Sequence, residues 1–108
     1  MNAQSLYVSR VLDQYVHLPG TLRRVLRQDR RTALALYRRG VRLDLVENAF
    51  VLAIARRAFR SNADHLDPIR CLEYFLPVVD ELIQEPPLPE YLEYLKSRLI
   101  TAGVLQPT

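Results

Sequence analysis

The chain is poor in residues that many small proteins use for cross-linking and metal binding. Its 108 residues include one Cys, one Met, three Gly and no Trp. The single Cys71 excludes an internal disulfide and any zinc site built from several cysteines, which fits a reducing compartment. No stretch approaches the roughly 18 apolar residues of a membrane span, and residues 1–5 lack the basic start of a signal peptide. We therefore expect a cytoplasmic protein that does not enter a membrane.

Lysine is scarce as well, because 14 of the 15 basic residues are Arg. The planar guanidinium group binds phosphate or carboxylate in a bidentate manner that an ammonium group cannot match. The bias is thus compatible with phosphate recognition. It is equally compatible with a GC-rich genome, whose codons favour Arg over Lys, and the composition leaves both explanations open.

The sequence also lacks the residue patterns of an enzyme. It contains no nucleophile and base at a recognisable spacing, no metal-ligand spacing and no Gly-rich phosphate loop. His17 and His65 are far apart, and Cys71 precedes Leu72 in an apolar context that predicts a buried, unreactive thiol. We expect a protein without enzymatic activity, cofactor or bound metal.

Helical periodicity is present in every long segment of the chain. Hydrophobic residues make up 49% of the sequence, and no segment alternates apolar and polar residues as a half-buried strand does. The predicted fold is all-α, a single compact bundle of four to five helices over residues 1–108 with a short tail at 104–108.

In the first half we expect three helical segments. The first spans residues 2–16 and ends before Pro19-Gly20. The second lies within 21–39, but Asp29 falls in its apolar sector, which predicts a short helical turn, a break and a new helix capped by Gln28 or Asp29. The third spans 44–59 with Asp44 as its cap, and because it is apolar on nearly all sides it is predicted to be the central helix.

The second half is predicted to hold two further helices. Asp67-Pro68 is a typical helix start, a capping acid followed by proline in the first turn. Pro77 then either kinks this helix or ends it and allows a new one to begin. The proline-rich segment 85–89 reads as a stiff connector before a last helix over 90–102.

Charge is divided unequally along the chain. Residues 1–60 carry twelve Arg and four acidic residues, a net of +8, whereas residues 61–108 carry three basic and eight acidic residues, a net of −5. A concentration of positive charge attracts an anionic partner. The candidate nucleic-acid-binding residues are the arginines on or next to the polar side of the 21–39 segment: Arg23, Arg24, Arg27, Arg30, Arg31, Arg38, Arg39 and Arg42. The alternative is an ordinary solvated face, although few acids interrupt this one.

Residues 35–46 have the spacing of a helix-turn-helix motif, with Gly40 in the turn. As a DNA reader, the second helix would present Arg42, Asp44, Glu47 and Asn48. However, a recognition helix needs a polar face, and residues 45–55 offer almost none. An ordinary corner between two packed helices is the favoured interpretation.

Two stretches of sequence resemble known proteins when taken together. These are Arg39-Gly40-Val41-Arg42-Leu43-Asp44-Leu45-Val46-Glu47-Asn48-Ala49 and Asp67-Pro68-Ile69-Arg70-Cys71-Leu72-Glu73-Tyr74-Phe75-Leu76-Pro77-Val78-Val79-Asp80-Glu81-Leu82. They are similar to uncharacterised small all-helical proteins and domains of bacteria, often encoded on mobile elements or near replication genes. Cys71 stands where a small hydroxyl residue is expected. The resemblance implies a helical fold and genomic proximity to nucleic-acid functions, but no catalytic or binding residue.

From these observations we expect a non-enzymatic accessory protein of a bacterial mobile element or replication system. Its basic half would contact nucleic acid or a nucleoprotein complex through phosphates. The alternative is an adaptor or inhibitor that engages an acidic protein surface. The opposite charges of the two halves also leave open a homodimer in which the basic half of one copy meets the acidic half of the other.

Overall fold

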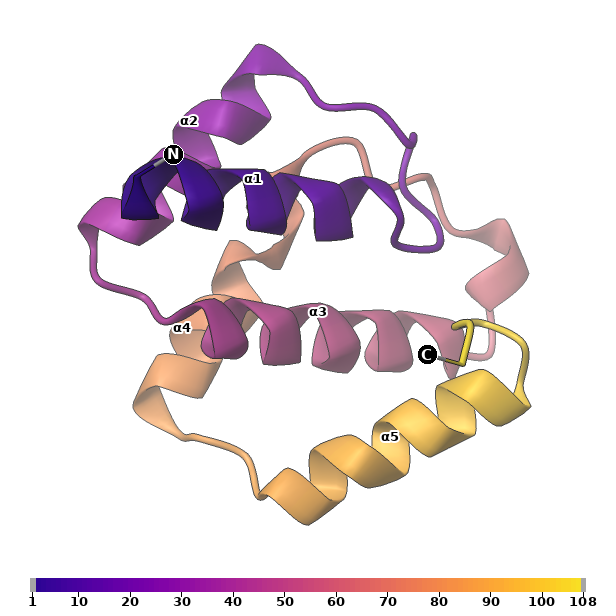
Figure 1. Ribbon diagram of the computed structural model, residues 1–108. Helices are drawn as coiled ribbons and strands as arrows, with labels where there is room; N and C mark the ends of the chain where they lie inside the picture. The colour runs from indigo at the N-terminus through magenta and orange to yellow at the C-terminus, as the bar shows by residue number, and fades with distance from the viewer. Residues whose placement is uncertain (1, 108) are drawn as a thin grey trace.

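Helix α3 (Leu43–Ala58) is the centre of the fold. The computed structural model describes residues 2–107, in which five α-helices and two short 3₁₀ helices occur and no β-strand is formed. Helix α3 contacts α1 (Ala3–Val16), α4 (Leu76–Gln84) and α5 (Pro89–Thr101), and α1 and α5 lie on opposite sides of it (Figure 1). The predictions of an all-α bundle and of a central third helix are confirmed.

The apolar residues of α3 explain its central position. Seven of them, Val46, Ala49, Phe50, Leu52, Ala53, Ile54 and Ala55, are buried. Phe59, expected in the same buried set, is 40% exposed, and the Arg98 guanidinium lies 4.3 Å above its ring. The predicted Asp44 cap is also wrong. Arg42 occupies the cap position without a side-chain bond, and Asp44 lies in the first turn, where its charge suits the helix dipole.

Helix α2 (Arg27–Arg38) packs against α1 and begins later than the helical pattern of its segment suggests. The predicted break is confirmed, but the short helical turn before it does not form. Residues 21–26 form no helix, and Thr21 makes an isolated parallel bridge with Ile69. The Leu22 N–H donates to Ile69 O at 3.2 Å, and the Ile69 N–H donates to Gly20 O at 2.7 Å.

The same bridge overturns the predicted helix start at Asp67-Pro68. After a 3₁₀ turn η1 (Ala63–His65), residues 67–71 run extended, and the Ile69 side chain is 1% exposed. Helical structure begins only with the 3₁₀ helix η2 (Leu72–Phe75), which continues into α4. Pro77 lies in the first turn of α4, where proline loses no helical hydrogen bond, so a new helix begins there and no kink is needed.

Residues from most helical elements share one hydrophobic core. Tyr15, Phe50 and Phe75 form edge-to-face contacts within it, with centroid distances of 6.1 Å and 4.9 Å. The segment after α5 returns to the core through Val104 and Leu105, while Thr108 of the predicted tail lies outside the described residues. The radius of gyration is 13.7 Å, close to the ~13 Å expected for a compact chain of this length. Within residues 2–107 no helix has both the length and the apolar character that crossing a membrane requires.

Candidate nucleic-acid interface

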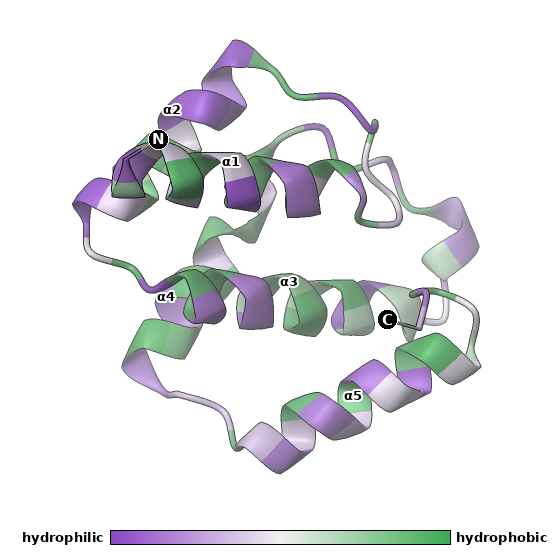
Figure 2. Ribbon diagram, viewed as in Figure 1, coloured by the Kyte–Doolittle hydropathy of each residue, from purple (hydrophilic) through white to green (hydrophobic). Residues whose placement is uncertain are grey.

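The outer face of α2 displays a line of arginines. Arg27, Arg31 and Arg38 follow one another at four and seven residues, a spacing that keeps them on one side of a helix. Figure 2 shows α2 coloured mostly as hydrophilic. All eight candidate residues are exposed: Arg23, Arg24, Arg27, Arg30, Arg31, Arg38, Arg39 and Arg42. From Arg27 to Arg38 the line extends about 16 Å along the helix axis.

Asp29 fixes the start of α2 and therefore the direction of this arginine line. Its side chain is fully buried and accepts two backbone hydrogen bonds, from the Leu26 N–H at 2.8 Å and from the Leu72 N–H at 2.9 Å. The first bond caps α2 from its third position. The second joins α2 to the start of η2. Asp29 thus caps the helix, as one of the sequence-based alternatives held, but from inside the first turn.

Arg23 and Arg24 lie in the non-helical connection before α2. Arg23 has a φ of 58°, the left-handed region that non-glycine residues rarely adopt. Thr21 supports this conformation, since its Oγ1 accepts from the Arg23 N–H at 3.3 Å and donates to Leu18 O at 2.9 Å. The connection therefore holds both arginines on the outside, next to the N-terminus of α2.

Two of the eight candidate arginines are engaged by carboxylates. Arg39 pairs with Asp80 of α4 at 2.8 Å, and Arg42 pairs with Asp44 at 2.9 Å. The other six, Arg23, Arg24, Arg27, Arg30, Arg31 and Arg38, have no carboxylate within 4.0 Å among residues 2–107. These six form the unpaired arginine face.

The acidic half of the chain meets the basic half inside the fold. Besides the Arg39–Asp80 pair, Arg56 of α3 binds Glu81 of α4 through both terminal nitrogens of its guanidinium group, at 2.9 Å and 2.5 Å. This bond lowers the pKa of the Glu81 carboxyl. Gln28 also donates to Glu73 at 2.7 Å. Some arginines of the first half are therefore neutralised by carboxylates of the second half within one molecule. This weakens the case for a homodimer in which opposite halves of two copies meet.

The helix-turn-helix interpretation fits the structure poorly. The second helix of the motif would be α3, which contacts α1, α4 and α5. Glu47 accepts a hydrogen bond from the Gln14 side chain at 2.8 Å, and Asn48 is half-buried. Of the four reading residues only Arg42 and Asp44 are exposed, and they pair with each other, so α3 offers no extended polar side that could enter a DNA groove. The geometry favours a packed corner.

Tyr37 lies next to Arg38 in the last turn of α2. Its ring is half-buried and packs edge-on against Tyr7, with a centroid distance of 5.3 Å. The Tyr7 hydroxyl donates to Val41 O at 2.8 Å, and burial raises its pKa. This arrangement ties α1 to the α2–α3 turn. Tyr37 therefore has an internal packing role.

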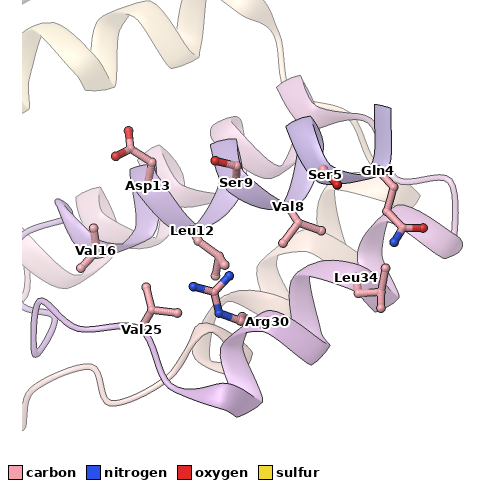
Figure 3. Close-up of a pocket in the computed structure, with 10 residues that line it drawn as sticks. All are labelled: Gln4, Ser5, Val8, Ser9, Leu12, Asp13, Val16, Val25, Arg30 and Leu34. Atoms are coloured by element: carbon pink, nitrogen blue, oxygen red, sulfur yellow. The ribbon is translucent and has the colours of Figure 1, made fainter. Parts of the chain in front are cut away.

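A groove between α1 and α2 was not anticipated from the sequence. It has a volume of about 520 Å³ and an apolar floor of Val8, Leu12, Val16, Val25 and Leu34 (Figure 3). Gln4, Ser5, Ser9, Asp13 and Arg30 complete its lining. Arg30 reaches from α2 toward α1, whereas Asp13 points away from α2. Helical periodicity did not identify Leu34 as a binding residue. Only the packing of α1 on α2 brings these apolar side chains together.

Cys71 departs modestly from its expected environment. It is half-buried, not buried, and it precedes η2 in an extended conformation.

Comparisons with protein-family models, with curated proteins and with solved structures give no match to this chain.

Proposed function

We propose that this chain is a non-enzymatic accessory protein that contacts nucleic acid through phosphates, in a bacterial mobile element or replication system. The observation that carries the proposal is the unpaired arginine face, six exposed guanidinium groups with no carboxylate partner among residues 2–107. Exposed arginines with no internal partner are available to replace the counterions of a phosphate backbone.

The dimensions of this face suit a polyanion better than a single phosphate. Along B-DNA, an axial length of about 16 Å passes roughly five phosphates of each strand. The arginine line of α2 has that length, and Arg23 and Arg24 extend it at one end. No base-reading element accompanies it, because α3 is packed on several sides. The proposed contact is therefore largely independent of base sequence.

Titration of the protein against a duplex and a single strand, each at about 50 and 200 mM salt, tests this proposal. With about four phosphates contacted, affinity should fall roughly 100-fold between the two concentrations. Asn48→Ala should leave affinity unchanged, because Asn48 is half-buried, uncharged and outside the unpaired arginine face. Absence of binding at the lower salt concentration would contradict the proposal and favour the adaptor that binds an acidic protein.

A further inference from the structure

The groove between α1 and α2 has the composition of a site for an amphipathic helix. Leu12 belongs to the hydrophobic core, and Val8 and Val25 pack against it, so the floor is held in place by the fold. Val16 and Leu34 are only half-buried and face the groove. No residue among 2–107 covers this apolar strip. Apolar side chains arranged in a strip between two helices typically bind the apolar side of a third helix.

The length of the groove supports the same partner shape. Its lining on α1 runs from Gln4 to Val16, which is about 18 Å at 1.5 Å per residue. Anchors of a bound helix at positions i, i+4 and i+7 span only about 10 Å. A nucleic acid has no apolar stripe that would fill this floor, whereas an amphipathic helix has one.

The charges beside the groove define the second property of the partner. On the α2 side, Arg30 lines the groove, and Arg27 and Arg31 stand next to it, all three exposed and without a carboxylate partner among the described residues. On the α1 side the polar lining residues are neutral Gln4, Ser5 and Ser9 and acidic Asp13. A helix that carries carboxylates along one edge of its apolar stripe complements this asymmetry.

We propose that the α1–α2 groove binds an amphipathic helix of a partner protein, with its apolar side on Val8, Leu12 and Leu34 and its acidic edge toward Arg30. This site goes beyond the phosphate contact, because its floor is apolar and Leu34, which lies between the arginines of α2, carries no charge. Arg30 belongs to both sites, so Leu34→Ser is the variant that separates them.

A designed peptide provides the probe. It is an eighteen-residue helix with Leu at every third or fourth position and Glu along one edge of the Leu stripe. One control peptide has Lys in place of each Glu, and another has the same residues in scrambled order. Fluorescence anisotropy should show saturable binding of the Glu peptide and binding at least about tenfold weaker for both controls.

Protein variants locate the binding site. Leu34→Ser and Arg30→Glu should each weaken peptide binding about tenfold or more, whereas Arg10→Glu, the same charge change on α1 outside the groove lining, should change it less than about threefold. Thermal unfolding of each variant establishes that it is folded. Leu34→Ser should leave duplex binding unchanged, because it removes no charge.

Four outcomes would overturn this inference. The first is that the Lys peptide binds as tightly as the Glu peptide, and the second is that folded Leu34→Ser protein binds the Glu peptide as well as the parent does. The third is that Leu34→Ser loses duplex binding but keeps peptide binding. The fourth is that the parent protein is a dimer and Leu34→Ser converts it to a monomer. The third outcome would assign the groove to nucleic acid, and the fourth to a second copy of the chain. Failure of the duplex titration alone would leave the groove intact and overturn only the phosphate contact.

Discussion

Asp29 is a buried carboxylate whose two oxygens each hold a different backbone N–H group. The Leu26 N–H lies at the start of α2, and the Leu72 N–H lies at the start of η2, 43 residues from Asp29 in the chain. Both N–H groups need an acceptor, because an unpaired buried donor costs about 1–3 kcal/mol. This one side chain therefore sets where two helical segments begin.

The Asp29→Asn substitution tests this role. The amide keeps one acceptor oxygen but places its NH₂ group opposite the other N–H, so one charge-assisted bond is lost and two donors face each other. We expect the free energy of unfolding to fall by roughly 2–4 kcal/mol. Asp13→Asn, an exposed substitution on α1, should cost less than about 0.5 kcal/mol. Urea denaturation of both variants provides the comparison, and equal stabilities would refute the role of Asp29.

Tyr15 contributes to the core through its ring, while its hydroxyl finds no hydrogen-bond partner among residues 2–107. Burial raises the pKa of Tyr15 from 10.0 to about 12, with smaller contributions from Asp29 and Cys71. The unfolded chain therefore loses this proton first as the pH increases. The folded protein therefore keeps its full stability below pH 10, and part of that stability is lost as the pH rises from 10 toward 12.

We accordingly expect Tyr15→Phe to preserve stability at neutral pH or to increase it by about 1 kcal/mol, because an unpaired buried hydroxyl is removed. Between pH 10 and 12 the parent should lose roughly 2–3 kcal/mol more than the variant. Chemical denaturation across this pH range measures the difference. Parallel pH curves for the two proteins would count against a neutral, buried Tyr15.

At the scale of elements, the two connections that pair with each other matter as much as the helices. The segment before α2 and the segment before η2 meet at the Thr21–Ile69 bridge. Arg57 lies against the second of these segments, because its guanidinium donates to Asp67 O and lies 5.9 Å from the Tyr74 ring centroid, and it also approaches Gly20 at the start of the first. Gly20 has a φ of +85°, and a Cβ there would stand 3.2 Å from Arg57 Nε.

The Gly20→Ala substitution should therefore destabilise the protein for two reasons. Backbone strain at positive φ costs about 1–2 kcal/mol, and displacement of Arg57 should add roughly 0.5–1.5 kcal/mol through its bond to Asp67. Gly40→Ala is the matched control, since Gly40 has a φ of +75° and open space around the added Cβ. Thermal unfolding should rank Gly20→Ala below Gly40→Ala, and the reverse order would show that Arg57 does not restrain this connection.

The helices that sequence reasoning placed well are those whose ends depend on local signals. The predicted spans 2–16, 44–59 and 90–102 lie within about two residues of α1, α3 and α5. The helix expected to be capped by Gln28 or Asp29 begins slightly earlier, with Leu26 at the N-cap of α2, whereas the start of α4 was misplaced because it depends on distant partners. Ile69 pairs with residues 20–22, and Leu72 bonds to Asp29, so Asp67-Pro68 precedes an extended segment despite its capping pattern. Local pattern cannot reveal such tertiary bonds.

In the candidate site, too, features that depend on local sequence were predicted and features that depend on tertiary contacts were not. Exposure of the eight arginines followed from their position opposite the apolar sector, and the structure agrees. The pairing of Arg39 with Asp80 could not be deduced, because it joins α2 and α4 across the fold. The α1–α2 groove was missed for the same reason, since Leu34 and Val8 meet only through helix packing.

At the scale of the whole molecule, arginines form ion pairs on one side and lack a carboxylate partner among residues 2–107 on another. The Arg39–Asp80 and Arg56–Glu81 pairs join α4 to α2 and α3. The unpaired arginine face remains on the outer side of α2 and on the connection before it. With a formal net charge of +3 for the chain, this face is where a polyanion is expected to bind.

The most direct test of this account is the salt dependence of duplex binding in Arg27→Glu/Arg31→Glu protein and in a control of equal charge, Arg10→Glu/Arg60→Glu. Both control residues are exposed and lie outside the unpaired arginine face. Removal of two phosphate contacts should reduce the slope of log affinity against log salt by about 2 and abolish binding at about 200 mM salt. The control should keep nearly the parent slope. Equal slopes in both double variants would contradict the claim that α2 contacts phosphates.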